Sequence, residues 1–130
     1  MRTEIRKRGK LFALLVDLSD AQDGTHPASE HSWPQQVLLM KRPKGYVVRK
    51  HTHKKIPRTS AQPMEALVVI KGEVQATIFD RKGAFIAKKN VASGQCLIIL
   101  DGAHEVTFTK NTSAYEFKPG PYKKEEKRFL

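Results

Sequence analysis

Two of the five histidines in the chain, His51 and His53, are separated by a single residue. The surrounding pattern predicts a strand over residues 46–54, and the two-residue period of a strand would place both imidazoles on one face. Two neutral imidazoles from one strand are suitable ligands for a divalent metal ion. Because such a pair also occurs on exposed strands and as hydrogen-bonded histidines in protein cores, the pair alone does not decide between metal binding and a structural role.

A glutamate and a third histidine fall on two further predicted strands. Glu65 opens the apolar run 66–70 and has the parity of Leu67, so it lies at an edge or faces inward, where a carboxylate must be paired or bound to metal. His104 has the parity of Val106, and strand alternation places it inside. A shared metal ion would offset the desolvation cost of these groups. The sequence therefore predicts a metal centre formed by His51, His53, Glu65 and His104.

Short strands must position these side chains. Alternating or apolar runs separated by glycines predict about nine strands, and no segment has helical spacing with caps. The predicted strands are residues 10–17, 36–42, 46–54, 65–71, 73–80, 84–89, 95–100, 103–110 and 113–118. An all-β chain of this kind closes as a sandwich, a jelly roll or a small barrel.

The length of 130 residues predicts one domain, residues 1–130. Residues 1–9 are expected to form a basic leader, residues 18–34 a long loop and residues 119–130 a charged, solvated tail. The apolar run 11–16 is too short for a signal peptide or a membrane span, so we expect a cytoplasmic protein.

The charge balance favours anionic partners. The chain has 24 Lys and Arg against 13 Asp and Glu, a formal net charge of +11. Eight basic residues and no acidic residue lie between Lys41 and Arg58. Arg49 shares the parity of the paired histidines and Arg58 lies in the following loop, so both are candidates for binding a small anionic substrate, with a solvated surface as the alternative. The few aromatic residues are not interleaved with this cluster, which argues against nucleic-acid binding.

The single cysteine, Cys96, excludes an intramolecular disulfide and any zinc site built from paired cysteines. Cys96 lies on an apolar predicted strand, where we expect it to be buried and inert. A reactive thiol facing the metal is the alternative.

The motifs resemble the two signatures of the cupin superfamily over residues 36–118. They are Gly45-x5-His51-x-His53, then Glu65-x6-Gly72, and later Gly94 leading to Asp101-Gly102-Ala103-His104. The resemblance implies a double-stranded β-helix, that is, a jelly-roll cupin barrel. It also implies that His51, His53, Glu65 and His104 hold one divalent transition metal, Fe, Mn, Ni or Zn. Eleven residues separate His53 from Glu65, where the family usually has three or four.

The chain is also similar to small single-domain bacterial cupins encoded among genes for surface-polysaccharide and sugar-nucleotide metabolism. That likeness rests on Pro57-Arg58 and Gly120-Pro121-Tyr122. It implies a metabolic context and not a reaction. The first hypothesis is a metal-dependent enzyme, an isomerase, epimerase or dioxygenase, acting on a sugar nucleotide or organic acid. The alternatives are a non-catalytic sugar- or anion-binding cupin and a metal-free epimerase with a cavity histidine as base. The resemblance further implies a homodimer, with residues 11–16 as the contact.

Overall fold

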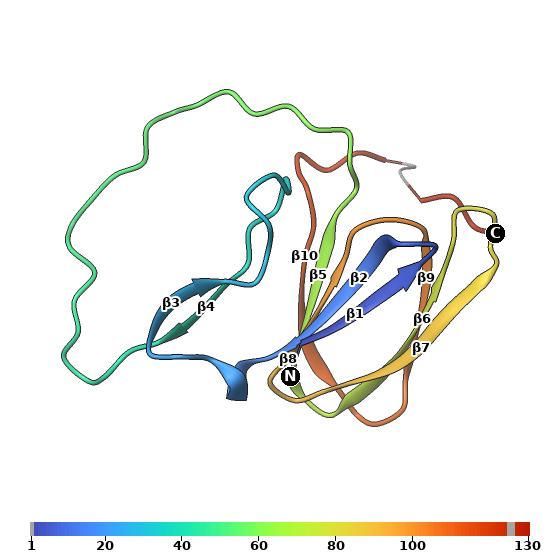
Figure 1. The fold of residues 1–130 in the computed structure, drawn as a ribbon, viewed down its shortest axis with the longest axis horizontal. Helices are drawn as coiled ribbons and strands as arrows, with labels where there is room; N and C mark the ends of the chain where they lie inside the picture. The colour runs from blue at the N-terminus through green and yellow to red at the C-terminus, as the bar shows by residue number, and fades with distance from the viewer. Residues whose placement is uncertain (1, 125–126) are drawn as a thin grey trace.

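The computed structural model describes residues 2–124 and 127–130 and is built from antiparallel strands (Figure 1). One 3-10 turn, η1 (Leu18–Asp20), interrupts them. The strands are β1 (Arg2–Lys7), β2 (Lys10–Asp17), β3 (Gly24–Pro27), β4 (Leu38–Lys41), β5 (Glu65–Lys71), β6 (Glu73–Phe79), β7 (Phe85–Ala92), β8 (Gln95–Ile99), β9 (Ala103–Phe108) and β10 (Ser113–Phe117). The all-β prediction is therefore confirmed.

A five-stranded sheet in the order β1-β2-β8-β5-β10 forms the centre of the molecule. Its middle strands are apolar on both faces because both faces are covered. In β2, for example, Leu14 and Leu15 point to opposite sides and are 0% and 3% exposed. This sheet therefore separates two hydrophobic layers.

The first layer lies between this sheet and a three-stranded sheet in the order β7-β6-β9. Ile78 and Val74 of β6 meet Leu97 of β8 and Val69 of β5 there, and all four are fully buried. The two sheets contact each other mainly through β7, which lies against β1, β5 and β8. These sheets form a β-sandwich.

The second layer lies on the opposite face of the five-stranded sheet. Met64, Ile98 and Leu14 are fully buried there. Trp33 and Leu39, from the segment that includes the β3–β4 hairpin, pack against them. The region expected to be a long loop, residues 18–34, thus contains η1 and β3 and supplies part of a core.

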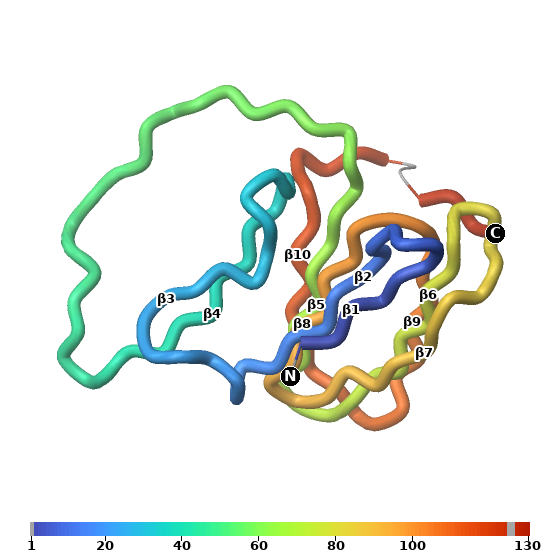
Figure 2. Tube along the Cα trace, viewed as in Figure 1, coloured from blue at the N-terminus to red at the C-terminus, as the bar shows by residue number. Residues whose placement is uncertain are grey.

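The described residues form an open sandwich and not the closed jelly-roll barrel that the resemblance implies. β9 is paired only with β6, and β10 only with β5, within the part of the chain that the structure describes. The strand predicted over residues 46–54 is absent, which corrects the sequence-based prediction. Residues 42–63, here called the arm, have no regular structure and are exposed throughout, forming the wide arc in Figure 2. A segment with strand propensity forms a strand only when a neighbouring strand pairs with it, and none lies beside the arm.

The amino terminus differs from expectation in two ways. The segment read as a basic leader contains β1, which pairs with β2 and buries Ile5. Since β2 lies between β1 and β8, residues 13–16 of the expected dimer contact have both strand edges paired within the chain. The described residues include no helix long and apolar enough to span a membrane.

Candidate functional site

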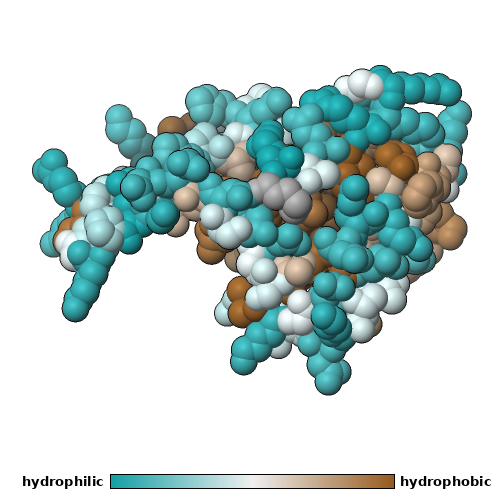
Figure 3. Space-filling view, turned by 60° about the horizontal axis from the view of Figure 1, so that its bottom comes forward, coloured by the Kyte–Doolittle hydropathy of each residue, from teal (hydrophilic) through white to brown (hydrophobic). Residues whose placement is uncertain are grey.

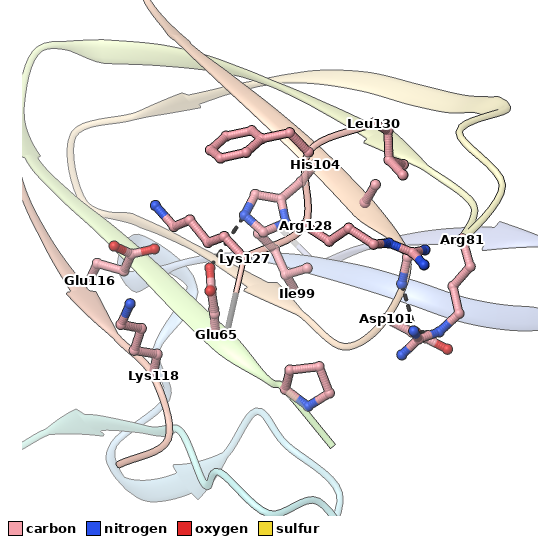
Figure 4. A pocket seen from close by; sticks show the side chains of 14 residues that line it. Glu65, Arg81, Ile99, Asp101, His104, Glu116, Lys118, Lys127, Arg128 and Leu130 are labelled. Atoms are coloured by element: carbon pink, nitrogen blue, oxygen red, sulfur yellow. Dashed lines mark hydrogen bonds and ion pairs between the residues drawn. The ribbon is translucent and has the colours of Figure 1, made fainter. Parts of the chain in front are cut away.

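A cavity of about 370 Å³ opens at one end of the sandwich. The start of β5, the start of β9 and the end of β10 provide its walls, and residues 127–130 lie across it (Figure 4). Its size is in the range typical of small-molecule sites. Polar and charged side chains from these segments converge in it.

Glu65 and His104 meet inside this cavity. The Nε2 atom of His104 lies 3.3 Å from Oε2 of Glu65, and the two side chains are 31% and 21% exposed (Figure 4). The pKa of the Glu65 carboxyl lies below its ordinary value, mainly because His104 donates a hydrogen bond to it. Burial alone would raise this pKa. Both residues were predicted to face inward, and the structure brings them together.

Gly102 fixes the start of β9, two residues before His104. Its φ of +81° lies in the left-handed region, which side chains disfavour. A Cβ there would also overlap the carbonyl oxygen of Phe79, the last residue of β6. The close approach of these two backbones therefore needs glycine and sets where the His104 side chain enters the cavity.

Glu116 of β10 is a cavity residue that the sequence analysis did not identify. Burial is the main cause that raises the pKa of its carboxyl, and the adjacent Glu65 carboxyl adds to the shift. No local signal in the sequence identifies it, because all five residues of β10 are exposed, Glu116 among them. Two carboxyl groups and one imidazole thus adjoin in one cavity.

Basic side chains surround this acidic centre. Lys118 follows β10, while Lys127 and Arg128 come from the segment expected to be a solvated tail. On the opposite rim, Nε of Arg81 lies 2.7 Å from Oδ1 of Asp101. The cavity therefore combines hydrogen-bond acceptors at its centre with cations at its rim.

Asp101 anchors this rim to the amino-terminal hairpin through an ion pair with Lys10. Partial burial alone would raise the pKa of Asp101. The hydrogen bonds from Lys10 and from the Gly102 N–H outweigh that effect and hold the pKa below its ordinary value.

The arm carries the other expected ligands away from the cavity. His51 and His53 are exposed, with ring centroids 5.0 Å apart in an edge-on arrangement. Nδ1 of His51 lies 2.7 Å from the Arg49 carbonyl oxygen. Arg49 and Arg58 also lie on the exposed arm and do not line the cavity.

The residues as placed do not form the complete centre of three histidines and one glutamate. The described part of the chain contains no cluster of three or more His, Cys, Asp or Glu side chains positioned to hold a metal ion. Glu65 and His104 do fit as two of the donors. Two donors each about 2.1 Å from one ion are roughly 3.0–3.4 Å apart, and these two are separated by 3.3 Å.

Cys96 lies outside the cavity. It belongs to the hydrophobic layer on the hairpin side of the sheet and is 8% exposed. Burial raises the pKa of its thiol to about 11. The expectation that Cys96 is a buried, unreactive thiol agrees with this position.

Comparison of the chain with protein-family models, with curated proteins and with solved structures found no significant match.

Proposed function

We propose that the cavity binds a small, hydroxylated anion of the sugar-phosphate or sugar-nucleotide class. The observation that carries the proposal is the contact between Glu65 and His104 inside a cavity whose rim is basic. Carboxylates accept hydrogen bonds from hydroxyl groups, and lysine and arginine bind phosphate. The carboxyl groups of Glu65 and Glu116 would face the sugar hydroxyls, and Lys127 and Arg128 would face the phosphate.

His104 is the proposed proton-transfer group of this site. When Nε2–H of a neutral imidazole donates to Glu65, the ring is oriented and its Nδ1 becomes an acceptor. A histidine held by a carboxylate in this way is suited to act as a general base. The proposed reaction class is therefore proton abstraction at an acidic C–H, as in an epimerase or isomerase.

A divalent metal centre is the second candidate. The specific observation in its favour is the 3.3 Å separation of the Glu65 oxygen and the His104 nitrogen, which suits two ligands of one ion. His51 and His53 would have to approach from the arm. A bound ion would act as a Lewis acid toward the anionic substrate.

Calorimetric titration with glucose 1-phosphate tests the binding proposal. We expect His104→Ala and the double variant Lys127→Ala/Arg128→Ala each to weaken binding by about tenfold or more. The first releases the Glu65 carboxylate that would face the hydroxyl groups, and the second removes both cations that would face the phosphate. The matched control, Lys123→Ala/Lys124→Ala, removes the same charge from residues that do not line the cavity and should change affinity less than about twofold.

Two results would contradict the proposal. The first is equal binding of inorganic phosphate and glucose 1-phosphate, which would show that the hydroxyl groups contribute nothing. The second is equal weakening by the cavity and control variants, which would assign the effect to net charge alone. Incorporation of solvent deuterium into a bound sugar nucleotide, lost in His104→Ala, would establish the proton transfer.

A further inference from the structure

The arm carries a strong positive charge that the cavity does not use. Between residues 42 and 63 the sequence has no Asp or Glu and seven basic residues, Arg42, Lys44, Arg49, Lys50, Lys54, Lys55 and Arg58. All seven are exposed, and within residues 2–124 and 127–130 no carboxylate forms an ion pair with any of them. Figure 3 shows the arm as the mainly hydrophilic extension on the left. Charge of one sign that is not neutralised within the chain attracts an anionic partner.

Both ends of the arm are attached to the body of the molecule. Nη2 of Arg42 donates a hydrogen bond of 3.0 Å to Oγ1 of Thr25 in β3, and Nε2 of Gln62 donates one of 3.1 Å to the carbonyl oxygen of Leu100. Between these attachments, the hydrogen bonds that the described residues of the arm make stay within the arm. The arm is therefore a loop with two fixed ends, and its middle makes no hydrogen bond to the described body that would compete with a partner.

Apolar side chains are interleaved with the basic ones. Tyr46, Val47 and Val48 follow one another between basic residues and are 49%, 73% and 57% exposed. Ile56, the residue after Lys55, is 56% exposed. The two hydrophobic layers of the described chain do not include any of these four apolar residues. A partner that suits the arm must therefore accept both cations and exposed apolar side chains.

The adjoining hairpin presents apolar side chains as well. Leu39 of β4 packs against the core, while Leu38 and Met40, on the other face of this strand, are 52% and 49% exposed. Because β4 leads directly into the arm, the exposed apolar residues continue from the hairpin into the arm (Figure 1).

We propose that the arm binds the surface of an anionic phospholipid bilayer. The lysine and arginine side chains would bind the lipid phosphates and carboxylates, and residues 46–48 would insert at the boundary between headgroups and acyl chains. Binding of this kind gains affinity both from buried apolar area and from attraction to anionic lipids. The proposal concerns the arm and is independent of the ligand proposed for the cavity.

The same residues fit a nucleic acid less well. Nucleic acids without regular structure are held by aromatic side chains on which their bases stack. The arm has one Phe, Tyr or Trp residue, Tyr46, and the guanidinium of Arg42 lies 4.2 Å from the centre of its ring. Val47 and Val48 would have no partner on a phosphate backbone. The exposed aliphatic residues therefore favour the bilayer.

Sedimentation with lipid vesicles tests the role of the charge. We expect the protein to bind vesicles of phosphatidylcholine and phosphatidylserine, to bind vesicles of phosphatidylcholine alone far more weakly, and to be released by salt. Near an anionic surface each lysine or arginine contributes about fivefold in affinity. The variant Arg49→Gln/Lys50→Gln/Lys54→Gln/Lys55→Gln should therefore bind at least about a hundredfold more weakly.

A matched control removes the same charge from exposed residues outside the arm. It is Lys71→Gln/Lys88→Gln/Lys110→Gln/Lys123→Gln, and it should weaken vesicle binding by less than about tenfold, because these residues are spread over the body of the molecule. All eight substituted residues except Lys55 and Lys50 can be checked against wild type in the same thermal unfolding experiment as the two full variants, which keeps loss of fold separate from loss of binding.

A second pair of variants tests the apolar insertion. Val47→Ser/Val48→Ser keeps every charge and should weaken binding to the phosphatidylserine vesicles by about fivefold or more, while weak binding to a single-stranded oligonucleotide stays unchanged. An environment-sensitive fluorophore attached at Val47→Cys should shift to shorter wavelength when these vesicles are added. The same fluorophore at Lys88→Cys, on the exposed face of β7, should not shift.

Three results would overturn the proposal. One is equal binding to vesicles with and without phosphatidylserine. Another is equal weakening by the arm variant and the control variant, which would assign binding to net charge alone. The third is unchanged vesicle binding in Val47→Ser/Val48→Ser together with tighter, arm-dependent binding to the oligonucleotide, which would assign the arm to nucleic acid.

Discussion

Replacing His104 by alanine should destabilise the fold measurably, because the half-buried Glu65 carboxylate would lose its hydrogen-bond donor. A hydrogen bond to a charged group contributes about 1.5–3 kcal/mol when it is well enclosed. The two side chains are 31% and 21% exposed, so we discount this to about 1 kcal/mol for solvent screening. For a chain of 130 residues, about 1 kcal/mol corresponds to a fall in Tm of about 4 °C.

The pH dependence of this loss has a definite sign. The pKa of Glu65 is lower in the folded state than its ordinary value of about 4.5, so its contribution to stability is present above pH 4.5 and is lost as the pH falls through the folded-state pKa. The difference between wild type and His104→Ala should therefore be present at pH 7 and shrink in acid. Urea denaturation at pH 7 and at pH 3 measures it, with the exposed His31→Ala as the control. Equal stability of the wild type and His104→Ala at pH 7 would refute the contact.

Three further outcomes follow from the same geometry. Glu116→Gln should stabilise the protein at a pH above the folded-state pKa of Glu116. The pKa of this carboxyl is raised above its ordinary value of 4.5, so ionising Glu116 in the folded protein opposes folding. Equal urea midpoints of Glu116→Gln and wild type at pH 8 would contradict this. Gly102→Ala should cost at least about 1 kcal/mol more than Gly94→Ala, since both have positive φ but only Gly102 faces a clash, and thermal unfolding compares them. Cys96 should react with a thiol reagent at pH 8 far more slowly in the native protein than in denaturant, because its pKa is raised to about 11; equal rates would place it at the surface.

Local pattern was sufficient for the parts of the fold whose strands alternate against a core. β5 and β8 were predicted within one residue of their observed bounds, and parity alone placed Glu65 and His104 on inward faces. Both inferences depend only on the two-residue period of a strand and on the cost of burying a charge. For that reason the central pair of the candidate site could be predicted.

The remaining features depend on partners distant in the chain. Residues 1–9 were predicted to be a leader because they are rich in basic residues, and Ile5, the fully buried residue of β1, gives too little alternation to indicate a strand. The arm was read as a strand because Tyr46, Val47 and Val48 favour one, but a strand needs an edge to pair with. Lys127 and Arg128 are exposed, as expected of a solvated run, but nothing local indicates that this segment also lines the cavity. Each missed feature concerns a contact between segments, which single-strand periodicity does not encode.

The most direct test of the central claim is the side-chain NMR signal of His104 during titration with glucose 1-phosphate. The account predicts that the His104 ring nitrogens shift with saturation, that His31 does not, and that the His104 shift disappears in Lys127→Ala/Arg128→Ala at the same ligand concentration. An unchanged His104 signal at saturating ligand would contradict the assignment of this cavity as the binding site.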